Sequence, residues 1–349
     1  MEDKKVNRKK SVTLADIAKV VGVGSMTVSR AFRTPEKVSD ALREQIEKVA
    51  LELGYQIPIH SQSVRQSGLM LIYASDYLAY SELFLTLKKL LAAAAIDFII
   101  DTSITNANEE YNKLQTLALL KPEFVILSSA PHNGETVTLL KNLNIPVIEI
   151  LSQTPVPIDI NIGISQQKAI YELTCKHINK GYSQICFICE NHENWKSKQQ
   201  IIGWQRAMIN YGLNPDKTLS LTEDFSYTKA SSLLPEILLR WPTTELVLCG
   251  NMNMVNALIC ECFRRKIKIP EVLSIASIGS HDLAQSLFPS ISSADIPLRE
   301  LAETIFKVIK KCINGIDIEQ KVMISETAIH LRESSCSPTK ERFKQNDWM

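Results

Sequence analysis

The chain has 349 residues, of which 45% are hydrophobic and 22% are charged. That length predicts two or three packed units, and the composition is typical of a globular protein with enough apolar material for a core. A formal net charge of +1 excludes a uniformly basic protein that binds a polyanion over its whole surface.

The charge is unevenly distributed along the sequence. Residues 1–66 contain twelve Lys and Arg and eight Asp and Glu, a net charge of +4. The remaining residues contain twenty-seven and thirty, a net charge of −3. A small basic module on a slightly acidic body favours a nucleic-acid-binding head over an evenly charged enzyme.

The sequence contains no obvious targeting segment. MEDKKVNRKK leads into no apolar run, which a secretory signal peptide requires. The longest apolar run, LLAAAAI before Asp97, is too short to cross a bilayer. We therefore expect a cytoplasmic protein that does not engage a membrane.

The eight cysteines do not form a metal or disulfide pattern. Cys186 and Cys189 lie in ICFIC, a strand-like run in which residues three apart point to opposite faces. Cys260 and Cys262 lie two apart in a helix-like stretch and also diverge. We predict reduced, packed thiols, no bound metal and no cofactor.

Three short helices are predicted near the N-terminus, after a charged arm. Their boundaries follow from start and stop signals that include a capping box from Thr13 to Asp16 and the residues Gly22, Ser39 and Gly54. Gly24 or Ser25 would cap the second helix, and Thr34-Pro35 would end it. The predicted helices are Leu14–Val21, Ser25–Arg33 and Asp40–Gly54.

Beyond a polar stretch with one proline, the sequence alternates between strand-like and helix-length segments. The strand-like runs are LMLIYAS, DFIIDTS, FVILSSA, VIEIL, ICFICEN, LVLCGN and SIASIG. This alternation predicts mostly parallel sheets with helices on both faces. Because some 270 residues are many for one sheet, we expect two lobes, with PVPIDI near 155–160 as the joint.

The second predicted helix has an unusual outward face. VGVGSMTVSR places a tight glycine turn before a helix that presents short polar side chains and one arginine, as in a helix-turn-helix motif. We predict that Ser25, Met26 and Arg30 read base edges in a major groove, and that Thr27 and Ser29 contact phosphates. Small apolar residues, among them Ala18, Val23 and Val28, would let the helices cross closely. The alternative is an ordinary three-helix head in which Arg30 is only solvated.

LADIAKVVGVGSMTVSRAF followed by VSDALREQIEKVALELGY resembles the DNA-binding head of the LacI/GalR family of bacterial transcription regulators. The α/β remainder resembles that family's core, which is related to periplasmic binding proteins. Within the family, MTVSR, VIEI, SHD and KIPE are most similar to gluconate-operon repressors. The resemblance implies a small all-α helix-turn-helix head plus a core of two doubly wound parallel-sheet lobes.

The predicted organisation has four parts. Residues 1–55 are the basic arm and head, 56–67 a hinge linker, 68–335 the two-lobed effector-binding and dimerisation core, and 336–349 a tail. The resemblance implies a homodimer on a pseudo-palindromic operator, and a dimer of dimers is left open. It also implies a hinge side chain wedged into the minor groove, at Val64 here. The hinge departs from the family's Ala-Arg-x-Leu-Ala run, and Val64 is shorter than the usual leucine.

The resemblance also implies a small-molecule site between the lobes, beyond the carboxyl ends of the strands. This sequence departs from the family there, with Gln200 where an arginine is common, and Ser165 and Met252 where aspartates are common. Such a pocket suits neutral sugars less and an anion near Lys198 and His281 better, or it binds nothing. The predicted effector-binding residues are Ser75, Tyr80, Ser128, Ser165, Lys198, Gln200, Asn251, His281 and Asp282, with Ser129 and Asn253 nearby.

The leading interpretation is a DNA-binding regulator, a repressor, whose operator affinity responds to a sugar or sugar-acid effector. One alternative is a carbohydrate-binding protein or enzyme that uses the same α/β core. The sequence has no phosphate-binding loop, no GxGxxG and no metal-spaced histidine pair, which argues against an enzyme. His281 and Asp282 could act in catalysis only with a nucleophile, and no motif supplies a serine or cysteine for that role. A further alternative keeps DNA binding but has a degenerate, ligand-free core.

Overall fold

The computed structural model describes residues 12–34, 37–55, 67–128, 131–192, 194–221 and 225–335. The chain divides into two compact units, residues 1–66 and 67–349. The charged arm, the hinge linker with Val64, Ser129 and the tail beyond Ser335 lie outside the described residues.

In the described residues of the first unit, three α-helices form: α1 (Leu14–Val21), α2 (Ser25–Arg33) and α3 (Asp40–Glu52). The first two match the predicted boundaries, and the third ends two residues before the predicted Gly54. The Asp16 carboxylate accepts hydrogen bonds from the backbone amide and the hydroxyl of Thr13, 2.8 and 2.7 Å long, so aspartate serves in the capping box.

A compact core joins the three helices of the head. Its buried members come from all three, and Phe32 stacks on Tyr55 with ring centroids 5.9 Å apart. The predicted contact residues Ala18 and Val28 are buried, and Val23 packs against them as a partly buried side chain. The buried set is Ile17, Ala18, Val28, Ala31, Phe32, Ile46 and Ala50.

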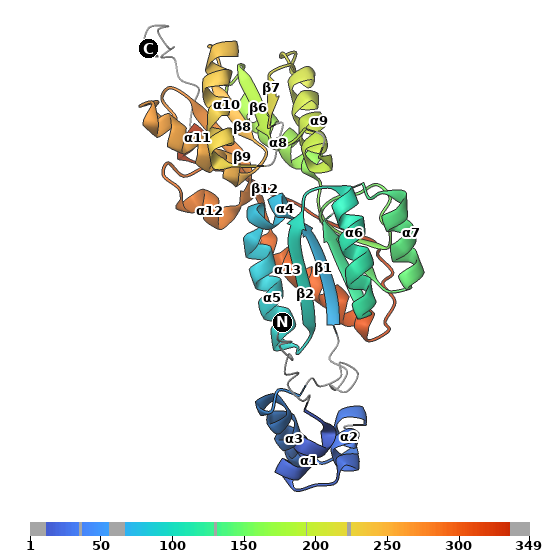
Figure 1. The fold of residues 1–349 in the computed structure, drawn as a ribbon. Coiled ribbons are helices and arrows are strands. Elements are labelled where there is room, and N and C mark those ends of the chain that lie inside the picture. The colour runs from blue at the N-terminus through green and yellow to red at the C-terminus, as the bar shows by residue number, and fades with distance from the viewer. Residues whose placement is uncertain are drawn as a thin grey trace, which may run out of the picture. The chain divides into compact units, whose positions relative to one another are not determined.

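The second unit contains two six-stranded sheets, each flanked by helices (Figure 1). The N-lobe sheet has the order β11-β5-β4-β3-β1-β2, and every neighbouring pair in it is parallel. Its strands are β1 (Ser67–Tyr73), β2 (Asp97–Ile104), β3 (Phe124–Ser128), β4 (Val147–Ser152), β5 (Ile160–Ile164) and β11 (Val322–Ser325).

Helices cover both faces of the N-lobe sheet. Apolar residues of α5 (Ser81–Ala93) and α13 (Leu298–Ile313) pack on one face, and those of α6 (Ala107–Leu117) and α7 (Gly134–Leu143) on the other. The short helix α4 (Ala74–Ala79) follows β1 directly, and the 3₁₀ turn η3 (Ala118–Leu120) follows α6.

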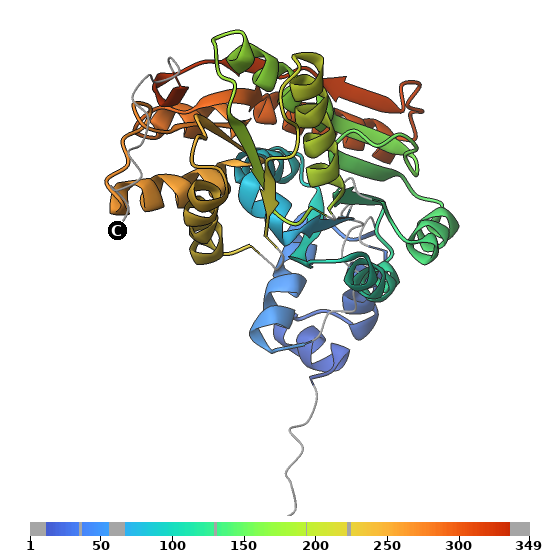
Figure 2. The same cartoon turned by 90° about the horizontal axis from the view of Figure 1, so that it is seen from above.

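The C-lobe sheet has the order β12-β10-β9-β8-β6-β7, parallel except that β12 runs antiparallel to β10. Its strands are β6 (Ile185–Cys189), β7 (Thr218–Ser220), β8 (Leu246–Cys249), β9 (Ser274–Ser280), β10 (Ser292–Ile296) and β12 (Ala328–His330). Helices flank this sheet too, as both views show (Figure 2). They are α8 (Gln166–Ile178), α9 (Trp195–Asn210), α10 (Tyr227–Arg240), α11 (Met252–Arg264) and α12 (His281–Ser286), and η4 (Glu333–Ser335) closes the described chain.

The predicted two-lobed architecture is confirmed, but the predicted joint is wrong. The segment near 155–160 links β4 to β5, which are neighbouring parallel strands of one sheet. The chain instead passes between the lobes after β5, after β10 and between β11 and β12. All seven predicted strand-like runs form strands, whereas β5, β7, β10, β11 and β12 were not predicted.

Most of the described cysteines and Trp204 are packed in the core of the second unit. Cys186 and Cys189 belong to different core clusters on the two faces of the C-lobe sheet, as their spacing predicts. Cys260 is exposed and Cys262 is buried. Trp204 is fully buried and stacks on Phe187, so it is a core residue. Among the described residues, no helix has both the length and the apolar character needed to cross a membrane.

Candidate functional site

The turn between α1 and α2 is made by glycine. Gly22 ends α1 in the left-handed conformation, with φ of 78°, which costs a residue with a Cβ atom far more than it costs glycine. Gly24 then forms the N-cap of α2 with an extended backbone. These two glycines set the angle at which α2 leaves α1, the arrangement that a helix-turn-helix needs.

Helix α2 buries one face and exposes the other. Val28, Ala31 and Phe32 pack into the head core, while Met26 is 66% exposed and Arg30 is also exposed. Met26 and Arg30 are four residues apart, so they are neighbours on the outward face. Ser25 is exposed beside them, and Thr27 and Ser29 are half-buried at the edges of this outward face.

The first turn of α2 brings no negative charge to its own N-terminus. The helix has no acidic residue there, and Gly24 supplies no side-chain cap. Helix α1 in contrast carries Asp16 in its first turn. The free amide groups and the helix dipole of α2 therefore favour an anion such as a phosphate at this end.

A buried charge cluster joins the two lobes of the core. Lys196 on α9 of the C-lobe places Nζ 2.8 Å from Asp76 Oδ1 on α4 of the N-lobe, and 3.9 Å from Glu190 Oε2. Nζ also lies 5.4 Å from the ring centroid of Tyr80. Burial alone would lower the pKa of the Lys196 ammonium, but Asp76 and Glu190 raise it instead, so the lysine stays charged.

Buried amides continue this cluster. Gln200 donates from Nε2 to Gln166 Oε1 at 2.8 Å and to the Gly250 carbonyl at 2.9 Å. Gln166 Nε2 in turn lies 3.5 Å from the Tyr80 hydroxyl of the other lobe. Asn251 donates to Glu190 Oε1 at 2.7 Å. Side chains from both lobes therefore meet in one buried polar network, which we call the interlobe cluster (Asp76, Tyr80, Gln166, Glu190, Lys196, Gln200 and Asn251).

The predicted effector residues fall into three places. Tyr80, Gln200 and Asn251 belong to the interlobe cluster. Ser128 and Ser165 serve the backbone, since their hydroxyls accept from the amides of Tyr73 and Lys168. Ser75 is half-buried, Lys198 is exposed, and His281 and Asp282 are exposed at the start of α12.

Sequence reasoning did not single out Lys196, Asp76, Glu190 or Gln166, although Asp76 lies in the predicted segment Ser75–Tyr80. A helical signal was available for Lys196, because it precedes Gln200 by four residues and therefore shares its face, whereas Lys198, two residues away, points elsewhere. Glu190 directly follows the buried strand β6. Its partner across the lobes, Asp76, could be identified only once the two lobes were in place.

Two family models match the chain. The model of bacterial regulatory proteins of the lacI family matches residues 13–57, and that of a periplasmic binding protein-like domain matches residues 176–335. Together they give the chain a LacI-type helix-turn-helix domain and a periplasmic-binding-like domain. The helix-turn-helix that the first model describes is the glycine turn and α2 described above.

Individual relatives agree with this assignment over nearly the whole length. The HTH-type transcriptional regulator GntR of Escherichia coli K12 is 26% identical over 323 residues, which cover 90% of this chain and 96% of that protein. The solved structure of a LacI-family transcriptional regulator from Silicibacter pomeroyi has a TM-score of 0.83 at 20% identity, covering 94% of this chain and 100% of that one.

A third comparison is the lac repressor dimer bound to operator and the anti-inducer ONPF. It has a TM-score of 0.73 at 15% identity and covers 93% of this chain and 99% of that one. With its LacI-type head, this chain is a DNA-binding transcriptional regulator, and relatives such as GntR are named as regulators and not as enzymes.

Proposed function

We propose that this regulator is a cytoplasmic homodimeric repressor that reads its operator with Ser25, Met26 and Arg30, with Thr27 and Ser29 on phosphates. The observation that carries the proposal is the outward face of α2, where Met26 and Arg30 are exposed as neighbours beside an uncapped helix N-terminus. Arginine pairs in a bidentate manner with guanine, and a methionine thioether suits the thymine methyl group.

A direct experiment selects the preferred duplex from a random library with the full-length chain and then measures affinity by gel shift. Arg30→Ala should weaken specific binding by about 1–3 kcal/mol and relax preference at one base pair. Lys48→Ala, which removes the same charge from an exposed position on α3, is the matched control and should change affinity little. Unchanged affinity in Arg30→Ala would exclude it as a base reader.

We propose, further, that the interlobe cluster receives a sugar-acid effector of the gluconate kind. The buried Lys196 ammonium would pair with the ligand carboxylate in place of Asp76. Gln200 Oε1 and Asn253 Nδ2 are buried and make no hydrogen bond among the described residues, and such atoms gain when a ligand hydroxyl meets them. This choice of ligand class follows the resemblance of MTVSR, VIEI, SHD and KIPE to gluconate-operon repressors.

The effector is tested by thermal shift with gluconate, related sugar acids and their phosphates, with glucose as the neutral control. A sugar acid should stabilise the chain through binding to the folded state, and Lys196→Met should lose that response while Lys198→Met, on the exposed side of α9, keeps it. A response to glucose equal to that of gluconate would remove the role of the carboxylate.

The second candidate is a regulator whose core binds no ligand. The observation that favours it is the Lys196–Asp76 ion pair itself, because the protein's own charges fill the place of an effector. A blank screen together with operator binding that no sugar acid alters would support this second function. In both cases the oligomeric state is checked by light scattering, which should return twice the chain mass.

A further inference from the structure

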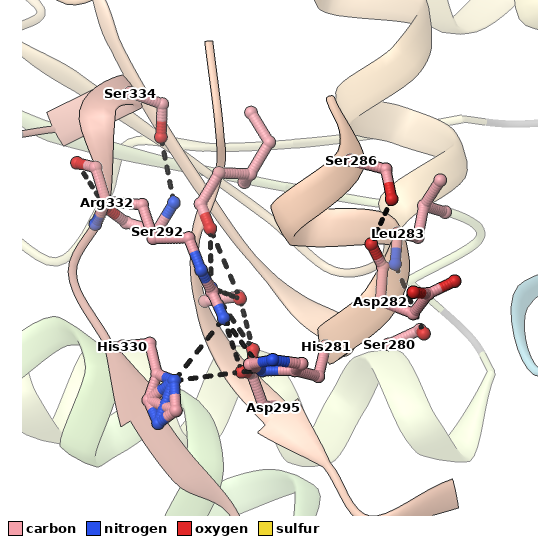
Figure 3. Close-up of polar contacts among 12 residues, drawn as sticks. Ser280, His281, Asp282, Leu283, Ser286, Ser292, Asp295, His330, Arg332 and Ser334 are labelled. Carbon is pink, nitrogen blue, oxygen red and sulfur yellow. Dashed lines mark hydrogen bonds and ion pairs between the residues drawn. The ribbon is translucent and has the colours of Figure 1, made fainter. Parts of the chain in front are cut away.

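Three potential metal ligands meet at the edge of the C-lobe, outside the interlobe cluster (Figure 3). His281 is the first residue of α12, Asp295 lies in β10, and His330 ends β12. The antiparallel register pairs Asp295 with Ala328 and Ser293 with His330, which puts Asp295 and His330 on the same face as diagonal neighbours. One ring nitrogen of each imidazole and one Asp295 carboxylate oxygen all lie within 4.8 Å of one another.

These three atoms surround one nitrogen of Arg332. Its Nη2 lies 2.6 Å from Asp295 Oδ2, 3.0 Å from His281 Nδ1 and 3.4 Å from His330 Nδ1. His281 Nδ1 also lies 2.5 Å from Asp295 Oδ2, and His330 Nδ1 lies 3.2 Å from the same oxygen. Two imidazole nitrogens and a carboxylate oxygen thus surround a single cationic centre. We call this set of His281, Asp295 and His330 the cation cradle.

The cradle has a rigid and a movable part. Asp295 is buried, and its second oxygen accepts from the Ser293 hydroxyl. The two histidine side chains are 53% and 44% exposed, and they can therefore rotate towards an ion that arrives from solvent.

Arg332 is also held by groups outside the cradle. Its Nη1 donates to the Ile291 carbonyl at 2.8 Å and to the Ser293 hydroxyl at 2.7 Å. The Nη2 arm is therefore the part that an incoming ion has to displace. Repulsion between a dication and the nearby guanidinium weakens binding, which makes Arg332 a built-in competitor for the site.

We propose that His281, Asp295 and His330 bind a divalent transition metal ion of the Zn²⁺ class, in competition with Arg332. Two imidazoles and one carboxylate are a common protein ligand set for such ions, and a borderline-soft metal prefers nitrogen donors over the all-oxygen sets that Mg²⁺ and Ca²⁺ take. The bound ion would tie β10, β12 and α12 together where the chain passes between the lobes. This inference is independent of the proposed operator and effector.

The test uses Zn²⁺ and the full-length chain without an affinity tag. Isothermal titration should give one ion per chain, with at least a tenfold loss of affinity in His281→Ala and in His330→Ala. His192→Ala is the matched control, since it removes another exposed histidine of the same lobe and should leave the affinity unchanged. Arg332→Gln, which keeps an amide donor but removes the charge, should bind Zn²⁺ at least tenfold more tightly.

Two results would overturn the proposal. One is a wild-type chain that takes up no more Zn²⁺ than the His281→Ala/His330→Ala double variant. The other is binding that neither histidine substitution weakens, because the ion would then sit on thiols or other surface groups. Should Arg332→Gln fail to fold, the histidine variants and their His192 control still decide the matter. A Zn²⁺-dependent rise in melting temperature that the double variant lacks is the second readout.

Discussion

Lys196 in the C-lobe and Asp76 in the N-lobe form an ion pair with Nζ and Oδ1 2.8 Å apart, in a place where both side chains are almost wholly buried. Pairs of this kind offset a large desolvation cost only while both partners remain. The contact therefore acts as a charged link between lobes, and any molecule that enters this place has to replace one of its partners.

Removal of the Lys196 ammonium should destabilise the fold, because the buried carboxylates lose their counter-charge. Lys196→Met leaves the Asp76 and Glu190 carboxylates without their cation, and we expect the free energy of unfolding to fall by about 3–5 kcal/mol. Adding Asp76→Asn should recover part of the loss, so the two substitutions will not be additive. Urea unfolding of the two single variants and the double variant measures this coupling, and strictly additive losses would contradict it.

A second buried charge predicts loss of stability in alkali. His132 Nδ1 lies 2.6 Å from Glu110 Oε1, and Nε2 lies 3.4 Å from Glu149 Oε1 without a hydrogen bond. Burial opposes the charged imidazole, but these two glutamates outweigh it and raise the pKa of His132 to about 9. Because the folded pKa exceeds the unfolded one, the stabilisation is complete below about pH 6.5 and is lost as pH rises through about 9.

The magnitude follows from the shift, since each pKa unit corresponds to about 1.4 kcal/mol, which gives about 3 kcal/mol here. Denaturant titrations at neutral pH and at about pH 9.5 should show the wild type losing this much more stability than His132→Gln. Parallel pH profiles for the two proteins would mean that the imidazole is not charged in the folded state.

His177 should respond in the opposite direction. It is buried, with Nδ1 2.8 Å from the Leu173 carbonyl and Nε2 2.8 Å from the Ser335 hydroxyl. Burial lowers its pKa to about 4. The neutral ring therefore stabilises the fold above about pH 6.5, and this contribution of about 3 kcal/mol is lost as pH falls through about 4.

The test measures the free energy of unfolding as a function of pH on the acid side of neutrality. Wild type should lose more free energy of unfolding between about pH 6.5 and pH 4 than His177→Asn does, although the variant starts lower. If the stability of the variant fell with pH as steeply as that of the wild type, other groups, the carboxylates in particular, would cause the loss of stability in acid.

Much of the fold follows from local signals in the sequence. The helices of the head follow from capping residues and glycines, because such signals act over three or four neighbours. The buried strands of the core are read from unbroken apolar runs. This rule does not find β10, which has the sequence SSADI. Its buried Ser292 is hydrogen-bonded to Ser334, Ser335 and Arg332, which come from a distant part of the chain.

The site was predictable only in part for the same reason. Gln200 and Asn251 were found through the resemblance to known regulators, and the outward face of α2 through helical spacing. Lys196 and Asp76 lie 120 positions apart in sequence, and Arg332 contacts His281 of the cation cradle across 51 positions. Such pairings depend on strand order and lobe closure. Neither composition nor periodicity contains that information.

The close packing of α9 on α8 gives the last prediction. A Cβ atom added at Gly203 would lie 2.2 Å from the Gln167 carbonyl oxygen of α8, and a backbone atom cannot move aside as a flexible side chain does. Gly203→Ala must therefore push two buried helices apart, next to the fully buried Trp204. We expect a loss of about 3 kcal/mol in the free energy of unfolding, at the upper end of overpacking effects.

Gly134→Ala is the matched control. Gly134 opens α7, and an added Cβ atom there meets nothing within 4 Å, so this substitution should stabilise the chain by about 0.4–1 kcal/mol by restricting the unfolded state. Urea unfolding separates the two results by sign. If Gly203→Ala were as stable as the wild type, α8 and α9 would have to lie further apart. The buried hydrogen bond between Gln200 and Gln166, which joins these two helices, would then not form.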